Sequence, residues 1–146
     1  MPSSIDAVMA LNVLWFGAGA VYFGVTTNSA IKRLVARSAR QSPLFSTVFA
    51  AVRFLGGLNL GFAVLAGILL FNRALFPETT QMAVLTSVLA LAHGTQFATN
   101  VSVAFSRGSQ DESHWPVLRG LMLFIFLTDF TLMVANGTLA AFLFAT

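Results

Sequence analysis

The chain contains no cysteine, and only 9% of its 146 residues are charged. The absence of cysteine excludes disulfide bonds and thiolate metal sites. Charged residues make up about 25% of an average soluble domain, so their scarcity here excludes an ordinary soluble protein. The same scarcity, together with a hydrophobic content of 57%, excludes intrinsic disorder.

In place of charge, the chain has four long apolar runs, at residues 7–27, 44–71, 82–105 and 117–143. A helix needs about 20 apolar residues to cross the hydrocarbon core of a bilayer, and each run reaches that length. A helix also satisfies its own backbone hydrogen bonds, as a lipid environment requires. The sequence therefore predicts an all-α fold, a bundle of four transmembrane helices that makes residues 1–146 a single, polytopic integral membrane domain.

The first apolar run differs from a secretory signal peptide in the residues that precede it. Its flank carries Asp6 and neither Lys nor Arg, whereas a signal peptide begins with a basic segment. We therefore expect residues 7–27 to be a retained helix.

The basic residues are distributed unevenly among the loops. Loop 28–43 carries four Lys and Arg residues and no acid, whereas loop 72–81 carries one Arg and one Glu. Short loops rich in Lys and Arg remain on the cytoplasmic side of a membrane. We therefore expect a bacterial-type inner (plasma) membrane protein with loops 28–43 and 106–116 in the cytoplasm and both termini outside.

The first loop also contains a short amphipathic pattern. Asn28 and Ser29 are residue types that cap helices, and they precede a predicted helix over residues 30–40. Its apolar face is suited to lie on the headgroups while its basic residues contact anionic lipid. A partnership with membrane lipid is thus expected, and nucleic-acid binding is not, because the chain has no basic domain to present.

Polar residues inside the apolar runs are the most informative part of the sequence, because they are costly in lipid. Several recur at intervals of seven residues, which is two helical turns and places them on one face. These are Asn12, Gly19 and Thr26 in the first run, Thr86, His93 and Asn100 in the third, and Asp129 and Asn136 in the fourth. The spacing predicts polar contacts in the interior of the bundle.

Two of these intramembrane residues carry opposite charges, namely Arg53 and Asp129. The second and fourth apolar runs, which carry these two residues, start on the same side of the membrane. A rise of about 1.5 Å per residue puts the two side chains at similar depths. Since an unpaired charge in mid-bilayer is unfavourable, we predict an Arg53–Asp129 pair. The predicted polar cluster, a candidate binding site, comprises Arg53, His93, Gln96, Asn100 and Asp129. A purely structural role for the cluster remains the alternative.

The sequence contains no recognisable catalytic, metal or cofactor site. His93 has no His or carboxylate three or four residues away, as a metal site on a helix would need. The other histidine, His114, belongs to a loop far from His93 in depth, so a haem held by two histidines is not expected. We therefore predict no catalytic residue, no metal and no cofactor.

Small residues form a second pattern in the second run. Gly57 and Gly61 make a GxxxG sequence, which lets two helices approach closely. Packing within the chain is one use of such a pair. Contact with a protein partner, or with a second copy of the chain, is the other.

The stretch Arg53-Phe54-Leu55-Gly56 and the later Asn72-Arg73 and His93 resemble the small four-helix scaffold proteins of ergosterol biosynthesis, over about residues 45–105. The same stretch is similar to uncharacterised bacterial four-helix membrane proteins of the DoxX-like class. The resemblance implies a non-enzymatic scaffold or accessory membrane protein.

Three functions follow from these observations. The first is an accessory or scaffold subunit of a membrane assembly, because the short loops leave no room for a soluble catalytic domain. The second is a binding protein or enzyme for a lipid-like substrate in a cavity between helices. The third is a small proton-coupled transporter that uses Asp129 or His93.

Overall fold

The computed structural model describes residues 2–105 and 116–146, and over these residues the chain is helical without strands. The long helices are α1 (Pro2–Gly19), α3 (Phe45–Phe71), α4 (Thr79–Phe105) and α5 (Gly120–Phe144). The short elements are a π-helix (Ala20–Val25) that continues α1, then α2 (Thr27–Leu34) and two 3-10 turns (Ser38–Gln41 and Arg73–Leu75). The predicted all-α fold is confirmed.

Four helical segments are long and apolar enough to cross a membrane, namely Ser4–Val25, Phe45–Phe71, Thr79–Phe105 and Gly120–Phe144. They correspond to the four predicted runs and identify an integral membrane protein. Part of the loop predicted at 106–116 lies outside the described residues, and so does His114.

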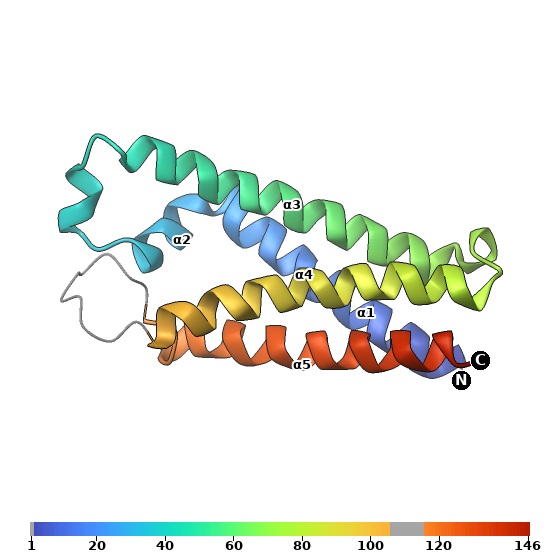
Figure 1. The fold of residues 1–146 in the computed structure, drawn as a ribbon. Helices are drawn as coiled ribbons and strands as arrows, with labels where there is room; N and C mark the ends of the chain where they lie inside the picture. The colour runs from blue at the N-terminus through green and yellow to red at the C-terminus, as the bar shows by residue number, and fades with distance from the viewer. Residues whose placement is uncertain (1, 106–115) are drawn as a thin grey trace.

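The long helices are arranged as two antiparallel pairs, α1 with α3 and α4 with α5 (Figure 1). Helix α1 runs obliquely between the pairs. It lies beside α5 at the end of the bundle where both termini are found, and beside α3 at the opposite end (Figure 1). The two pairs diverge toward the end that carries α2, and this divergence positions the candidate site.

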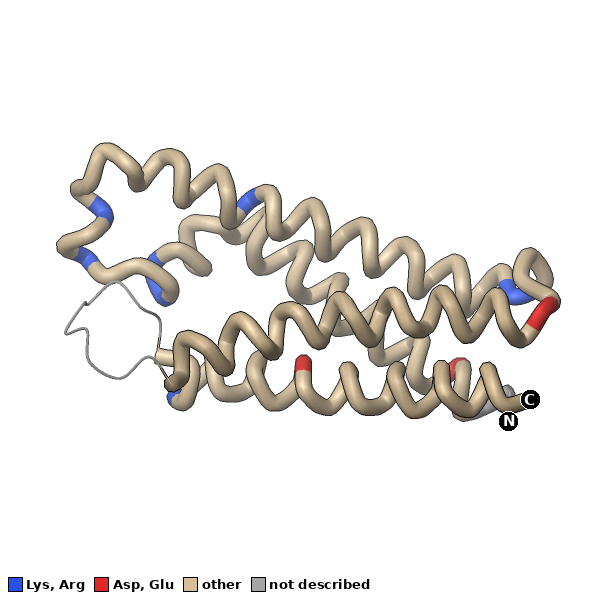
Figure 2. The backbone as a smooth tube through the Cα atoms, viewed as in Figure 1, with Lys and Arg blue, Asp and Glu red and all other residues tan. Residues whose placement is uncertain are grey.

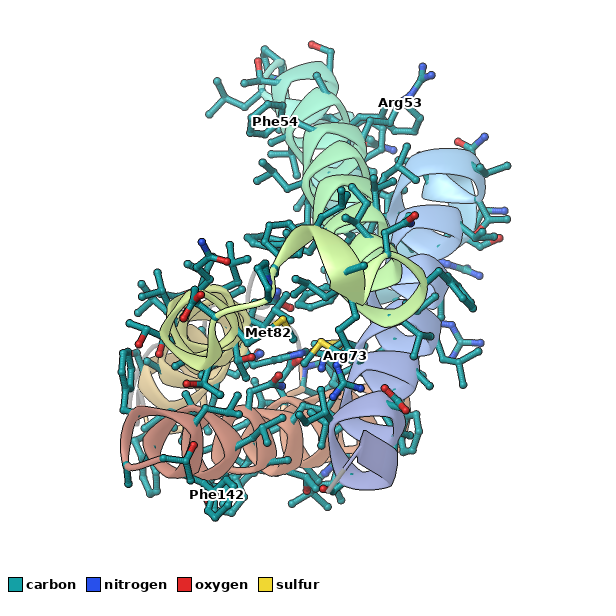
Figure 3. The ribbon with its side chains drawn as sticks, turned by 90° about the vertical axis from the view of Figure 1, so that its right-hand side faces the viewer. Arg53, Phe54, Arg73, Met82 and Phe142 are labelled. Atoms are coloured by element: carbon teal, nitrogen blue, oxygen red, sulfur yellow. The ribbon has the colours of Figure 1, made fainter. Side chains whose placement is uncertain are left out.

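The exterior of the bundle is apolar, as lipid contact requires. Large exposed side chains include Leu14, Phe54, Phe71 and Leu91. Phe54 and Phe142 point outward from α3 and α5 in the end-on view (Figure 3). Inside, a core of buried apolar side chains joins the helices toward the end with the termini, among them Met9, Phe16, Leu69, Met82 and Leu89.

Basic residues gather at the end of the bundle opposite the termini. They lie along the connection from α1 to α3 and at the start of α5 (Figure 2). At the end with the termini, Arg73 forms an ion pair with Asp6, with 2.8 Å between Nη1 and Oδ1. This uneven distribution has the form that the positive-inside rule describes.

The connection between α1 and α3 differs from its prediction. Helix α2 starts at Thr27 rather than at residue 30 and ends at Leu34, because Val35 adopts an extended conformation with φ −122° and ψ 125°. Asn28 and Ser29 lie within the helix and do not cap it. The apolar face of α2 packs on α3, where Ala30 and Ile31 are buried with Val52.

The π-helix explains a change of register along the first membrane segment. A seven-residue interval predicts that Thr26 shares the buried face of Asn12, but Thr26 is exposed and the adjacent Thr27 is buried. A π-helical turn contains an extra residue compared with an α-helical one. The buried face therefore moves along the sequence by one position.

Candidate functional site

The centre of the bundle contains a buried carboxylate and a buried imidazole in direct contact. Asp129 of α5 and His93 of α4 are both 0% exposed, and 3.1 Å separates His93 Nδ1 from Asp129 Oδ1. The indole Nε1–H of Trp15, in α1, donates a hydrogen bond to the same oxygen over 2.9 Å. Oδ1 of Asp129 is thus shared by side chains from two other helices.

The other side of the imidazole faces α1. His93 Nε2 lies 3.0 Å from Asn12 Oδ1, and the ring of Phe16 stacks on the imidazole with 4.4 Å between centroids. Asn12, Trp15 and Phe16 share one face of α1 because they are spaced by three and four residues. One face of α1 therefore contacts Nε2 and one side of the ring, while Nδ1 contacts Asp129 of α5.

A reciprocal amide pair joins α1 to α5 beside the imidazole. Asn12 Nδ2 donates to Asn136 Oδ1 over 3.0 Å, and Asn136 Nδ2 donates to Asn12 Oδ1 over 3.1 Å. Each Nδ2 also donates to the backbone carbonyl four residues earlier, that of Val8 and that of Leu132. These carbonyls accept and cannot donate, so they fix the orientation of both amides.

The fixed amides determine where the protons of His93 lie. Asn12 Oδ1 is an acceptor, so His93 Nε2 must carry a hydrogen and donate it. A single further proton then lies between His93 Nδ1 and Asp129 Oδ1, on one atom or the other. In both arrangements the Asp129–His93 pair has no net charge.

The second oxygen of Asp129 has no partner. Oδ2 is buried and forms no hydrogen bond with any described residue. An unsatisfied buried acceptor costs about 1–3 kcal/mol, and more when the group is charged. Such an atom in a native protein requires an explanation.

Asp129 also contributes to the wall of a cavity of about 470 Å³ between the two helical pairs. The other walls are mainly apolar and include Leu34 of α2 and Val52 and Leu55 of α3. Helix α4 adds polar side chains on the side of Asp129, namely Thr95, Gln96, Thr99 and Asn100. An apolar cavity with a few converging polar groups is the usual form of a small-molecule site.

A second cavity, of about 640 Å³, adjoins the first. The two share Phe23, Gln96 and Ile125 as walls. Trp15 and Tyr22 line the larger one, and the hydroxyl oxygen of Tyr22 is buried without a partner among the described residues. The Gln96 side-chain amide makes no hydrogen bond with a described residue either. Unused polar atoms therefore surround an apolar space.

The structure brings together four of the five residues predicted for the polar cluster. His93 and Asp129 are in contact, and Gln96 and Asn100 line the same cavity as Asp129. Asn100 is bound in part to its own helix, because its Nδ2 donates to the backbone carbonyl of Gln96 over 3.0 Å.

The predicted Arg53–Asp129 pair is wrong. Arg53 is exposed and points away from the other helices, on the outer side of α3 (Figure 3). Asp129 contacts His93 and Trp15 instead. Similar depth does not determine the direction in which each side chain leaves its helix, and a long Arg side chain can extend along an apolar surface to the membrane interface.

The close helix contact involves a different glycine from the predicted pair. A Cβ atom at Gly56 would collide with the backbone of Gly24, whereas Gly57 and Gly61 have nothing within 4 Å of theirs. Gly57 and Gly61 are exposed on α3. Neither glycine therefore packs against a described residue, and their contact with a partner stays a prediction.

Trp15 is a site residue that the sequence interpretation missed. Its indole nitrogen is the donor to Asp129, and the residue lies three positions after Asn12. That spacing was the available signal, since residues three apart share a helix face. Among the described residues, no group of three His, Cys, Asp or Glu side chains is placed to hold a metal ion.

Comparison of the chain with protein-family models, curated proteins and solved structures finds no match.

Proposed function

We propose that this integral membrane protein binds a small amphiphile between its two helical pairs, with Asp129 as the polar anchor. The observation that carries the proposal is the partnerless Oδ2 of Asp129, a residue in the wall of a cavity of about 470 Å³. Helix packing alone gives no reason to bury an acceptor without a donor. A ligand with a polar head and an apolar body supplies the donor and fills the space.

The dimensions and chemistry of the two cavities support this proposal. Their volumes, about 470 and 640 Å³, fall within the range of about 300–1,000 Å³ typical of ligand pockets. Leu34, in α2, belongs to the wall of the smaller one. We infer that the ligand enters from the end of the bundle that carries α2, where the two pairs diverge.

Tryptophan fluorescence tests the binding function. The chain has two tryptophans, so Trp115→Phe leaves Trp15, which contacts Asp129, as the only reporter. We expect 4-bromobenzyl alcohol to quench Trp15 fluorescence with a saturable dependence on concentration in a constant amount of detergent. Quenching that rises linearly without saturation would indicate partition into the micelle and overturn the proposal.

A pair of matched variants locates the binding. Thr99 lines the cavity with Asp129, so Thr99→Phe should fill the space and abolish saturable quenching. Thr138 is exposed on α5 and lines none of the cavities described above, so Thr138→Phe should retain wild-type quenching. Equal effects of the two substitutions would place the probe elsewhere.

We also propose, as a second candidate function, an accessory or scaffold role in a larger membrane assembly. The exposure of Gly57 and Gly61, with open space beside both, favours it. Gly57→Leu or Gly61→Leu should then abolish co-purification of a stoichiometric partner in mild detergent. His93→Ala should leave that partner bound, whereas a binding role predicts that the glycine changes have no effect and that His93→Ala impairs binding.

For the membrane orientation, we propose that the basic end of the bundle is cytoplasmic and that both termini lie outside, in a bacterial-type inner membrane. The support is the concentration of Lys and Arg in residues 32–40. Since the chain has no cysteine, Ser4→Cys and Ser38→Cys each introduce a single label site. An impermeant thiol reagent added to intact cells should label Ser4→Cys alone, and labelling of Ser38→Cys alone would reverse the orientation.

A further inference from the structure

The hydrogen bonds around Asp129 determine which chemical class of head group the cavity accepts. Resting on the proposed binding function, we infer that the ligand is an uncharged amphiphile with a hydroxyl group, that is, an alcohol or a phenol. Its hydroxyl donates a hydrogen bond to Asp129 Oδ2 and accepts one from the side-chain amide of Gln96. Its apolar body lies among the walls of the two adjoining cavities.

The charge balance of the site disfavours a cationic head group. The Asp129–His93 pair is neutral as a unit, because the Asn12 amide holds a proton on Nε2 and leaves a further proton between Nδ1 and Oδ1. An added ammonium group would give the buried site a net positive charge. Release of the shared proton would restore neutrality, but it would leave Nδ1 and Oδ1, two acceptors, facing each other at 3.1 Å.

No second acid compensates for such a charge within the described residues. The titratable side chains in the walls of the two cavities are Asp129 and Tyr22, and Tyr22 is a phenol. The basic side chains of the neighbouring helices, Lys32 and Arg33 of α2 and Arg53 of α3, are exposed. A buried charge without a partner is strongly unfavourable. This desolvation cost disfavours an ammonium head group and is absent for an uncharged hydroxyl group.

An anionic head group is disfavoured because it would bring negative charge to the site. Oδ2 is a carboxylate oxygen without a donor, so a carboxylate or phosphate would place negative charge beside an acceptor. Among the described residues, the cavity walls also contain no cation to pair with an anion, since the unused donors, the Gln96 amide and the Tyr22 hydroxyl, are uncharged. Trp15 Nε1–H is bound to Asp129, and the Nδ2 groups of Asn12 and Asn136 are bound to each other's side chains and to carbonyls.

A hydroxyl group matches the unused atoms of the site. It donates one hydrogen bond and accepts others, and the site offers the unused acceptor Asp129 Oδ2 and the unused Gln96 amide, which both donates and accepts. Gln96 lies three residues after His93, so both side chains leave α4 on the same side. An ammonium group donates only, so it could bond to the carbonyl oxygen of Gln96 but would leave the amide NH₂ without an acceptor.

Four probes of one shape test this inference in the single-tryptophan protein. They are 4-bromobenzyl alcohol, 4-bromobenzylamine as its ammonium ion, 4-bromobenzoate, and 4-bromotoluene, which has no polar head. Saturable quenching of Trp15 should be tightest with the alcohol. A hydrogen bond to a charged acceptor contributes about 1.5–3 kcal/mol, which corresponds to roughly 10- to 150-fold over 4-bromotoluene.

Two substitutions test separately the ligand's contact with the Asp129–His93 pair and its contact with Gln96. His93→Gln removes the imidazole and its proton and leaves a lone carboxylate, so the preference should change from the alcohol to the ammonium probe by about 10-fold. Gln96→Leu should weaken binding of the alcohol by about 2- to 10-fold and leave 4-bromotoluene unchanged. Gln81→Leu, on an exposed position near the start of the same helix, is the control and should affect neither probe.

The outcomes distinguish this inference from the proposed function. Saturable binding that is equal or tighter for the ammonium or benzoate probe in the wild-type chain would overturn the hydroxyl assignment while the binding function stands. Absence of saturation with all four probes would overturn the binding function itself. Because the ranking is measured in a chain with the complete hydrogen-bond network, it does not depend on the folding of the His93 variant.

Discussion

Helix α1 contacts its neighbours in two physically different ways. Toward α4 and α5 it presents side-chain hydrogen bonds from Asn12 and Trp15. Toward α3, the π-helix that continues α1 presents backbone, and a Cβ atom at Gly56 would collide with the backbone of Gly24. The polar contacts require particular side chains in particular orientations, whereas the glycine contact determines only how closely the two backbones approach.

The difference between these two contacts explains why the carboxylate can be part of a binding site. The polar side of α1 orients His93 and Asp129 through atoms that are fixed by backbone carbonyls. The α3 side contributes no hydrogen-bonding side chain to that network, so the cavity wall opposite Asp129 is apolar, with Val52 and Leu55. An oriented polar group that faces an apolar wall suits an amphiphile.

The largest effect should come from the glycine contact. Gly56→Leu inserts a side chain into the backbone of the π-helix at Gly24, and overpacking of this kind typically costs about 1–3 kcal/mol and occasionally more. Because backbone rather than a flexible side chain must move, we expect about 3 kcal/mol. The measurement is reversible unfolding in mixed micelles. Gly57→Leu, on the adjacent open position, is the matched control and should change stability by less than about 0.5 kcal/mol.

Disruption of the polar contact should cost less stability than the glycine substitution, and the losses of two such variants should not be additive. Asn12→Leu removes the acceptor of His93 Nε2 and the partner of Asn136, and leaving buried polar groups unpaired costs about 1–3 kcal/mol. Asn136→Leu should cost a similar amount. The double variant should lose less than the sum, because each single change leaves the other amide without its partner. Strict additivity would show that the two amides do not interact.

Substitution of charged side chains outside the site should have the smallest effect on stability. Arg73→Ala breaks a partly exposed ion pair with Asp6, and such pairs contribute about 0–1 kcal/mol. Arg53→Ala removes an exposed side chain and should change stability by less than about 0.5 kcal/mol. A double-mutant cycle of Arg53→Ala with Asp129→Asn should show no coupling. A coupling energy above about 1 kcal/mol would restore the pair that the sequence predicted.

The helices and part of the site could be predicted from the sequence because both depend on local pattern. The length of an apolar run decides whether a helix can cross a membrane. Spacing of seven residues placed Asn12, His93, Asp129 and Asn136 on interior faces, and all four are buried. These signals require knowledge of one helix at a time.

The remaining features depend on how helices are rotated and joined. The Arg53–Asp129 prediction matched depth but not direction, since the sequence does not show which face of α3 turns inward. The π-helix at Ala20–Val25 shifted the buried face from Thr26 to Thr27, which a constant period cannot anticipate. Trp15 was missed because its polar role comes from a single N–H at the edge of a large apolar ring.

A crystal structure of the chain grown with 4-bromobenzyl alcohol, with the bromine located by its anomalous scattering, would show directly whether a ligand binds at Asp129. We propose that Asp129 Oδ2 accepts a hydrogen bond from a ligand held between the two helical pairs. We predict bromine between α3 and α5, with the hydroxyl oxygen about 2.5–2.7 Å from Oδ2, as in other O–H···O⁻ bonds. A structure in which Oδ2 is bound to a donor of the protein itself, with no bromine between the helical pairs, would contradict the account.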